Sequence, residues 1–192
     1  MPGGQLLGDM APNFEANTTA GRIHLQDFLG NSRGILFSHP RDPAPVCCTE
    51  LGRAAKLAPE FAKRNVKLIP IALSIDSVED HLAWSKGINA YNGEEPTEKL
   101  PFPIIKDEKD MPVTAHVVFI VEAEAVYHLP ATTGRNFDET LRVVTSLQLT
   151  AEKRVATPVD WKDGGSVMVL PTIPEEEEFP SGKKHLRSLP QP

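Results

Sequence analysis

The chain has 192 residues, enough for one ordinary domain with a small appendage. Hydrophobic residues make up 40% of it and charged residues 24%, a balance typical of globular proteins that excludes a disordered chain. Acidic residues outnumber basic ones by 26 to 20, giving a net charge of -6. A general binder of nucleic acids or anionic membranes needs the opposite balance, so we expect neither function.

The sequence gives no sign of export or membrane insertion. No apolar run approaches the roughly 20 residues of a membrane-spanning helix, and residues 1–4 have no signal-peptide character. The two cysteines, Cys47 and Cys48, are adjacent, so they cannot build a disulfide framework. No histidine or acidic cluster accompanies them at metal-ligand spacing. We therefore expect a cytoplasmic protein without a metal or other cofactor.

The first half of the chain is predicted to alternate between strands and helices. Its predicted elements are a strand at 35–38, a helix at 47–65, a strand at 66–75 and a helix at 77–86. Ser77 is the expected N-cap of the last helix, with Asp80 three residues on. Pro70 is unusual within a central strand, because proline cannot donate a ladder hydrogen bond.

The second half adds a hairpin and one more long helix. Its predicted elements are strands at 117–121 and 125–129, a helix at 136–149 and a short strand at 167–170. This order indicates an α/β fold, a thioredoxin-like fold with a mixed central sheet. The turn-rich sequence after Thr150 predicts a domain over 1–150 and a small C-terminal extension over 151–192. Residues 175–178 are acidic and predict a solvated loop, followed by an extended arm.

Cys47 is expected in the first turn of the predicted helix, just after a proline-bearing loop. Backbone N–H groups and the positive end of the helix dipole stabilise a thiolate at such a position. A cysteine with an ordinary pKa of ~8.5 is only about 3% thiolate at pH 7, so lowering its pKa would create a strong nucleophile. The alternative interpretation is a buried structural cysteine.

The residues around Cys47 resemble the active-site loop of the peroxiredoxins, whose pattern Pro-x-x-x-Thr-x-x-Cys falls on Pro40 to Cys47. The chain is similar to the one-cysteine class, the peroxiredoxin 6 type. The segments that carry this resemblance are 8–14, 49–52, 74–77, 81–85, 100–105, 130–136 and 156–161. The resemblance implies an antioxidant thiol peroxidase that reduces hydrogen peroxide and organic or phospholipid hydroperoxides.

The resemblance also assigns roles to individual residues. Cys47 matches the peroxidatic cysteine, which becomes a sulfenic acid, and Pro40 matches the proline that shields it. Arg135 matches an active-site arginine that helps to activate the thiolate. His39 is either a packing histidine or a modulator of Cys47 ionisation. Because no distant cysteine can act as a resolving thiol, the class implies glutathione as reductant, a glutathione transferase as partner, and a homodimer or a heterodimer with a relative.

Two active-site positions depart from the family pattern. Ala44 replaces the threonine whose hydroxyl binds the peroxide, and His116 replaces an arginine. Losing one preorganised donor can cost about 10²–10³ in rate, so we expect a slower peroxidase. The alternative is a catalytically weak relative that acts by binding or dimerisation. Cys48, usually a threonine, is interpreted as an incidental substitution, since a vicinal disulfide would be strained.

The chain is also shorter than the family pattern. Only residues 106–110 separate the apolar segment ending at Ile105 from Met111, too few for the helix of relatives or for a parallel crossover of about a dozen residues. Relative to the same family pattern, the tail after Glu178 is shortened, and Pro70 and one neighbouring residue look like an insertion in a central strand.

Residues 30–34 match the Gly-x-Ser-x-Gly pattern of serine hydrolases, with Ser32 at its centre. The resembled class carries a calcium-independent phospholipase A2 activity that uses this serine, an upstream histidine and an aspartate. Here Gln26 occupies the histidine position, although His24 is nearby, and residues 122–124 contain no aspartate. A serine without a base is a poor nucleophile, so we interpret Ser32 as a turn residue and expect no residual phospholipase activity.

Overall fold

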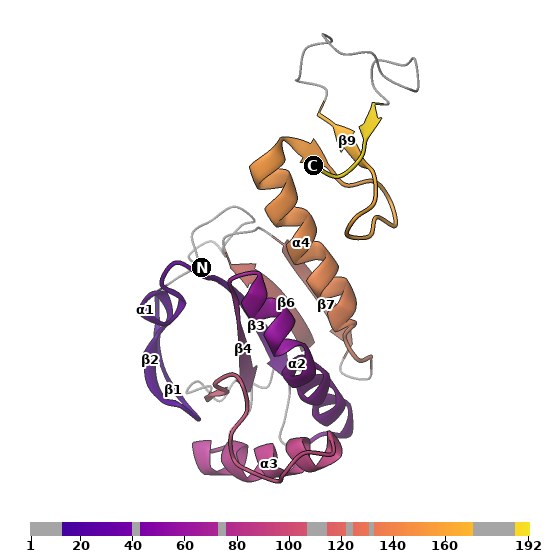
Figure 1. Cartoon of the computed structure of the whole chain (residues 1–192). Coiled ribbons are helices and arrows are strands. Elements are labelled where there is room, and N and C mark those ends of the chain that lie inside the picture. The colour runs from indigo at the N-terminus through magenta and orange to yellow at the C-terminus, as the bar shows by residue number, and fades with distance from the viewer. Residues whose placement is uncertain are drawn as a thin grey trace. The chain divides into compact units, whose positions relative to one another are not determined.

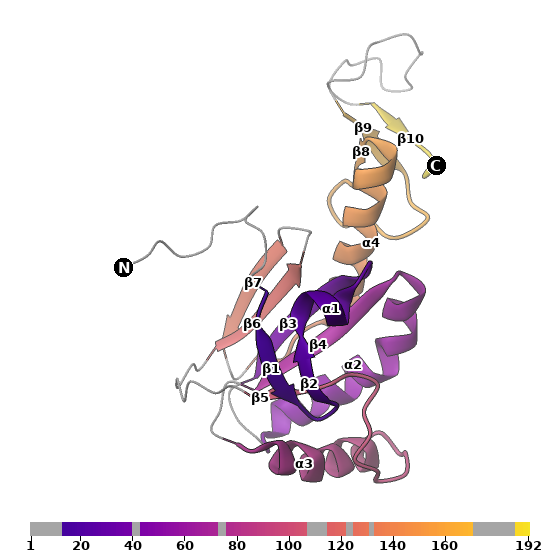
Figure 2. The same ribbon diagram turned by 90° about the vertical axis from the view of Figure 1, so that its left-hand side faces the viewer.

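A computed structural model of the chain describes residues 13–39, 43–72, 76–106, 115–121, 125–130, 133–170 and 187–192. The chain divides into two compact units, one ending at Phe137 and the other beginning at Asp138. The first unit contains a seven-stranded sheet of order β2-β1-β5-β4-β3-β6-β7 (Figures 1 and 2). This mixed sheet with its helices is the predicted α/β arrangement.

The centre of the sheet is built from the two strands that the apolar runs predicted. These are β3 (Arg33–His39) and β4 (Val66–Ala72), which pair in parallel. Between them in the sequence, α2 (Pro45–Lys63) packs against β4, as Figures 1 and 2 show. The buried residues Ile35, Phe37 and Ile69 are at most 1% exposed, as expected for strands covered on both faces. Residues 73–75 of the predicted second strand lie outside the described residues.

Pro70 does lie within β4, opposite Phe37 of β3. Pairing between β4 and β5 (Ile105–Lys106) involves only Ile71 and Ala72, which follow the proline. In the described pairing, Pro70 therefore has β3 on one side and no paired residue of β5 on the other. A strand position that is paired on one side only tolerates the missing N–H donor of a proline.

The helix α3 (Val78–Tyr91) begins as the sequence predicted and runs five residues further. The Ser77 side chain accepts a hydrogen bond from the Asp80 N–H, while the Asp80 carboxylate accepts one from the Ser77 N–H. This capping box satisfies backbone donors at the helix start. Trp84 and His81 of α3 are both buried, so they belong to the core.

The hairpin of β6 (Ala115–Val121) and β7 (Ala125–Pro130) is confirmed, and its strands pair antiparallel. β6 also pairs with β3, again antiparallel, whereas β5, β4 and β3 are parallel to one another. The connection from β5 to β6 therefore makes no parallel crossover, so the sheet does not require the dozen residues that such a crossover needs. Residues 107–114, where relatives were expected to have a helix, lie outside the described residues.

Several short elements escaped the sequence analysis because they are only two to five residues long. In the first unit they are β1 (Glu15–Thr18), β2 (Gly21–His24), α1 (Leu25–Leu29) and β5. They are held by one apolar cluster that also includes central-strand residues: Ala16, Leu25, Leu29, Leu36, Ile69 and Ile105. Such segments have no periodic pattern long enough to detect, and packing fixes them.

The second unit contains most of α4 (Phe137–Lys153) and a three-stranded antiparallel sheet. The strands are β8 (Val155–Ala156), β9 (Val167–Val169) and β10 (Ser188–Leu189). Val155, Trp161 and Val167 form their own small core, each at most 5% exposed. The predicted acidic loop at 175–178 and most of the arm lie outside the described residues. The predicted boundary at residue 150 falls within α4 and stays a prediction.

Candidate active site

Cys47 lies in the first turn of α2, where the sequence placed it. Ala44 is the N-cap, Pro45 is the first helical residue, and the first intrahelical hydrogen bond runs from the Cys48 N–H to the Ala44 carbonyl at 2.9 Å. Proline suits this first position because its missing N–H would have had no intrahelical partner. Cys47 is therefore at the positive end of a 19-residue helix, and it is only 1% exposed.

One turn further along α2, Glu50 binds Arg135 in a buried ion pair. Arg135 Nη1 donates to Glu50 Oε2 at 2.6 Å, and the Arg135 backbone N–H donates to Glu50 Oε1 at 2.7 Å. Both side chains are at most 3% exposed. Positions three apart on a helix share a face, so the ion pair lies on the side of α2 that carries Cys47.

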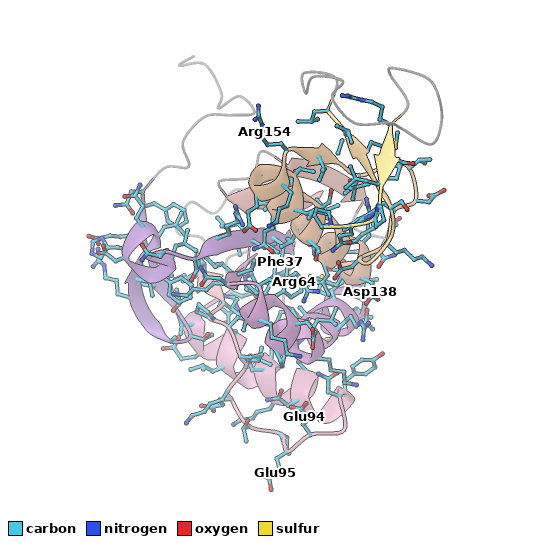
Figure 3. The ribbon with its side chains drawn as sticks, turned by 45° about the horizontal axis from the view of Figure 1, so that its top comes forward. Phe37, Arg64, Glu94, Glu95, Asp138 and Arg154 are labelled. Carbon is cyan, nitrogen blue, oxygen red and sulfur yellow. The ribbon has the colours of Figure 1, made fainter. Side chains whose placement is uncertain are left out.

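The Arg135 guanidinium is also fixed from the sheet. Its Nη2 donates to the Ser38 carbonyl at the end of β3, and its central carbon lies 5.4 Å from the centroid of the Phe37 ring. Figure 3 shows Phe37 in the interior of the first unit, whereas Glu94 and Glu95 project from the loop after α3. A guanidinium held by a carboxylate, a carbonyl and an aromatic face has little freedom to reorient.

Cys48, the neighbour of Cys47, has a specific partner on α3. The indole Nε1–H of Trp84 donates to Cys48 Sγ at 2.9 Å, and Cys48 is partly exposed where Cys47 is buried. The Trp84 ring also packs on the His39 ring, with centroids 5.1 Å apart. His39 is itself 1% exposed, so it is a core residue at the end of β3.

A surface depression of about 450 Å³ lies beside Trp84. It is lined by residues of α3 and of the segments that precede α2 and α3: Pro43, Asp76, Asp80, Ala83, Trp84 and Gly87. Of the lining residues that the structure describes, Asp76 and Asp80 carry carboxylates, and the Asp80 carboxylate also accepts the capping hydrogen bond from the Ser77 N–H.

The Ser32 hydroxyl forms a hydrogen bond with the side-chain amide of Asn65, which cannot act as a general base. It donates to Asn65 Oδ1 at 2.7 Å, and Asn65 Nδ2 donates in turn to the Asn31 carbonyl. His24, the nearby histidine, pairs instead with Glu15 at 3.1 Å. The amide of Asn65 thus ties the turn before β3 to the end of α2.

The structure gives less detail for two of the predicted site residues. Pro40 lies outside the described residues, and His116 is described only as part of β6, where its backbone pairs with Leu129.

Sequence analysis gave Glu50 no role, although this residue forms the buried ion pair with Arg135. Its only signal was a charged residue at a helical position facing the core, three residues after the cysteine.

Comparison with known proteins identifies the family. Residues 7–133 match the AhpC/TSA family, and residues 146–182 match the C-terminal domain of 1-Cys peroxiredoxin. The chain belongs to the one-cysteine peroxiredoxins. Peroxiredoxin-6 of Homo sapiens is 70% identical over 226 aligned positions, and the alignment covers all of both chains. Peroxiredoxin-6 of Gallus gallus is 63% identical over the same span. This peroxiredoxin has 192 residues against an alignment of 226 positions with these relatives, so the chain is shortened as predicted.

Solved structures confirm the predicted thioredoxin-like fold. A cysteine-to-serine mutant of peroxiredoxin 6 from Arenicola marina is 43% identical, with a TM-score of 0.86 over 98% of this chain and 99% of that one. A yeast mitochondrial 1-Cys peroxiredoxin is 35% identical, with a TM-score of 0.87 over 97% and 99%. The one-cysteine peroxiredoxin described here is accordingly an antioxidant, thiol-dependent peroxidase that acts with a thiol reductant.

Proposed function

We propose that Cys47 is the peroxidatic cysteine and that this chain reduces hydrogen peroxide and organic or phospholipid hydroperoxides through it. The observation that carries the proposal is the arrangement on α2: Cys47 occupies the positive end of the helix, and Glu50 holds the Arg135 guanidinium one turn away. A helix N-terminus and a nearby cation both favour a thiolate. Pro40 is proposed to shield the thiolate, and His39 to pack against Trp84 behind it.

The chemistry is a two-electron transfer. The Cys47 thiolate attacks the terminal peroxide oxygen, forming an S–O bond as the O–O bond breaks, and the departing alkoxide or hydroxide takes a proton from water. One external thiol then condenses with the sulfenic acid, releasing water and leaving a mixed disulfide. A second thiol attacks that disulfide and regenerates Cys47. We propose glutathione as this thiol, delivered by a glutathione transferase, with no bound cofactor.

Intact mass after brief exposure to low peroxide tests the assignment. We expect the folded protein to gain one oxygen rapidly, Cys48→Ser to do the same, and Cys47→Ser to gain none. Oxidation of Cys47 no faster than that of a free thiol would contradict the proposal. In that case the alternative, a catalytically weak relative acting by binding or dimerisation, is tested by co-purification with an intact relative.

The rate is proposed to be lower than that of a relative with the full family pattern. Ala44 stands at the N-cap of α2 with φ of -129° and ψ of 135°, and its methyl group offers no hydroxyl to a peroxide or to the helix. His116 replaces the family arginine in β6. Comparing the second-order rate of Cys47 oxidation with that of Ala44→Thr and His116→Arg variants measures the deficit.

Phospholipase A2 activity is not proposed for this chain. The hydrogen bond from Ser32 to the Asn65 amide and the pairing of His24 with Glu15 support a structural role for this serine. Phospholipid turnover that disappears in Ser32→Ala would contradict this interpretation.

We propose a cytoplasmic protein that forms a homodimer or a heterodimer with a relative. Among the helices that the structure describes, none has the length and apolarity to cross a bilayer. The proposed division assigns peroxidase chemistry to residues 1–150 and leaves 151–192 as an extension. Sedimentation of the full chain, alone and mixed with a relative, tests the assembly.

A further inference from the structure

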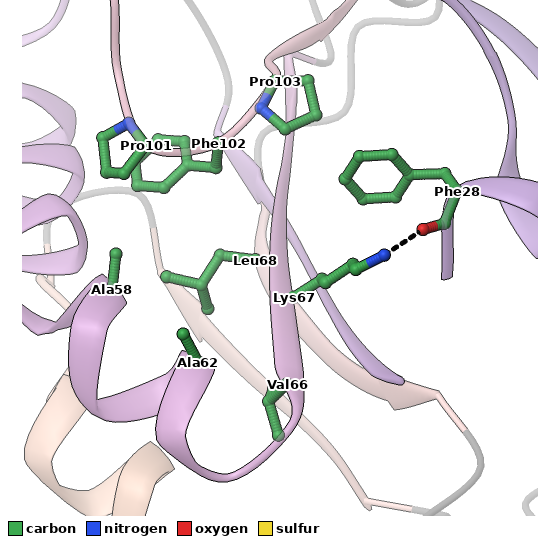
Figure 4. Close-up of a pocket in the computed structure, with 9 residues that line it drawn as sticks. All are labelled: Phe28, Ala58, Ala62, Val66, Lys67, Leu68, Pro101, Phe102 and Pro103. Atoms are coloured by element: carbon green, nitrogen blue, oxygen red, sulfur yellow. Dashed lines mark hydrogen bonds between the residues drawn. The ribbon is translucent and has the colours of Figure 1, made fainter. Parts of the chain in front are cut away.

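A second cavity, of about 230 Å³, lies far from Cys47 along α2. Its walls come from four parts of the first unit, and its lining residues are Phe28, Ala58, Ala62, Val66, Lys67, Leu68, Pro101, Phe102 and Pro103 (Figure 4). Ala58 is 11 residues after Cys47 on the helix, which corresponds to about 16 Å at ~1.5 Å per residue. The cavity is therefore separate from the peroxidase site.

The cavity exists because the sheet is incomplete beside the first half of β4. The described pairing of β5 with β4 begins only at Ile71, so the segment at 101–103 passes alongside Val66 to Leu68 in place of a paired strand. Pro101 and Pro103 have no amide donors, and they cannot complete such a ladder. Space is left between this segment, the end of α2 and α1.

The floor of the cavity is apolar and its rim is accessible. Leu68 and Phe102 are at most 5% exposed, whereas Ala62 and Pro101 are exposed. An apolar cavity of about 150 Å³ is large enough to bind benzene, so a volume of about 230 Å³ accommodates an aromatic ring with a short substituent.

Among the lining residues that the structure describes, the only charged group is the Lys67 ammonium. It donates to the Phe28 carbonyl, as the dashed line in Figure 4 shows, and lies 5.0 Å from the centroid of the Phe28 ring. Within the described part of the chain, no carboxylate pairs with Lys67. An ammonium has three donors, so two remain after the bond to Phe28. A half-buried cation without a counter-ion beside an apolar cavity favours an anion with an apolar body.

We propose that this cavity binds a small monocarboxylate whose apolar part is about the size of a phenyl ring. The carboxylate pairs with the Lys67 ammonium on one side of β4, and the ring passes the edge of the strand to contact Leu68 and Phe102, which Figure 4 shows on the other side. Such a ligand matches both features of the site, since a neutral apolar molecule leaves the cation uncompensated and a small inorganic anion leaves the apolar floor in water.

Fluorine NMR titration of the full chain tests this proposal, with 4-fluorophenylacetate as the probe and 4-fluorophenylacetamide as its neutral match. We expect saturable binding of the acid, and binding of the amide weaker by about fivefold or more. Lys67→Met retains the side-chain stem and is expected to weaken binding of the acid about tenfold, equivalent to about 1.4 kcal/mol. Lys63→Met, an exposed lysine of α2 outside the lining, is the matched control and should bind normally.

Ala62→Phe supplies a second variant, because a larger side chain at this exposed helical position blocks the rim without disturbing the core. It should abolish binding while circular dichroism and peroxide consumption match those of the unsubstituted chain. Absence of saturable binding, equal affinity for the acid and the amide, or unchanged binding by either Lys67→Met or Ala62→Phe would overturn the proposal. Should Lys67→Met not fold, the amide comparison and Ala62→Phe decide the outcome.

Discussion

The Glu50 carboxylate accepts hydrogen bonds from both the backbone and the guanidinium of Arg135, a residue 85 positions later in the sequence. This contact joins α2, which carries Cys47, to the segment that precedes α4. The guanidinium also donates a hydrogen bond to the Ser38 carbonyl at the end of β3. One buried pair thus ties together three segments around the cysteine, and changes to it are expected to affect both stability and activity.

Glu50→Gln should destabilise the fold by about 3 kcal/mol, because it leaves the buried Arg135 charge without its counter-ion. Urea unfolding of the full chain at pH 7 measures this change. Glu60→Gln is the matched control on the same helix, where an exposed glutamate pairs with Lys63 and Arg64, and a much smaller effect is expected. Similar losses in the two variants would contradict the importance of the buried pair.

Ala44→Thr is expected to stabilise α2 and accelerate Cys47 oxidation together. The backbone at Ala44 already has the extended conformation of an N-cap, so a hydroxyl there can accept from the N–H of Val46 or Cys47, contributing about 1 kcal/mol. Restoring one donor should raise the oxidation rate about tenfold or more, given that one such donor contributes about 10²–10³ in other enzymes. Ala44→Val has the same shape without the hydroxyl and should show neither gain.

Glu139 on α4 is expected to make a pH-dependent contribution to the free energy of unfolding. Two hydrogen bonds from Arg142, at 2.6 and 2.7 Å, lower the Glu139 pKa below its ordinary value; burial opposes this, and the charge of Arg142 adds to it. Because the folded-state pKa is the lower one, the stabilisation is present above the ordinary pKa of 4.5 and lost as the pH falls through the folded value. Glu139→Gln should therefore cost a few tenths of a kcal/mol at pH 7 and nothing in strong acid. Thermal unfolding across pH checks this, and a loss that persists in strong acid would disprove it.

The longer elements and the family could be predicted from the amino-acid sequence alone. Apolar runs predicted β3 and β4, helical spacing predicted α2 and α4, and the Ser77–Asp80 spacing predicted the cap of α3. These features are local: periodicity and capping depend on residues within a few positions of one another. The motifs around Cys47 likewise lie in continuous segments, so they could be recognised without a fold.

Only the tertiary structure shows which residues far apart in the sequence contact one another. No local pattern indicates that Glu50 binds Arg135, that the Trp84 indole donates to Cys48, or that Asn65 holds Ser32. The cavity above Lys67 exists because β5 is two residues long and two prolines follow the edge of β4, a consequence of strand pairing across the sheet. Pairing between remote segments depends on the whole core, which no window of the sequence contains.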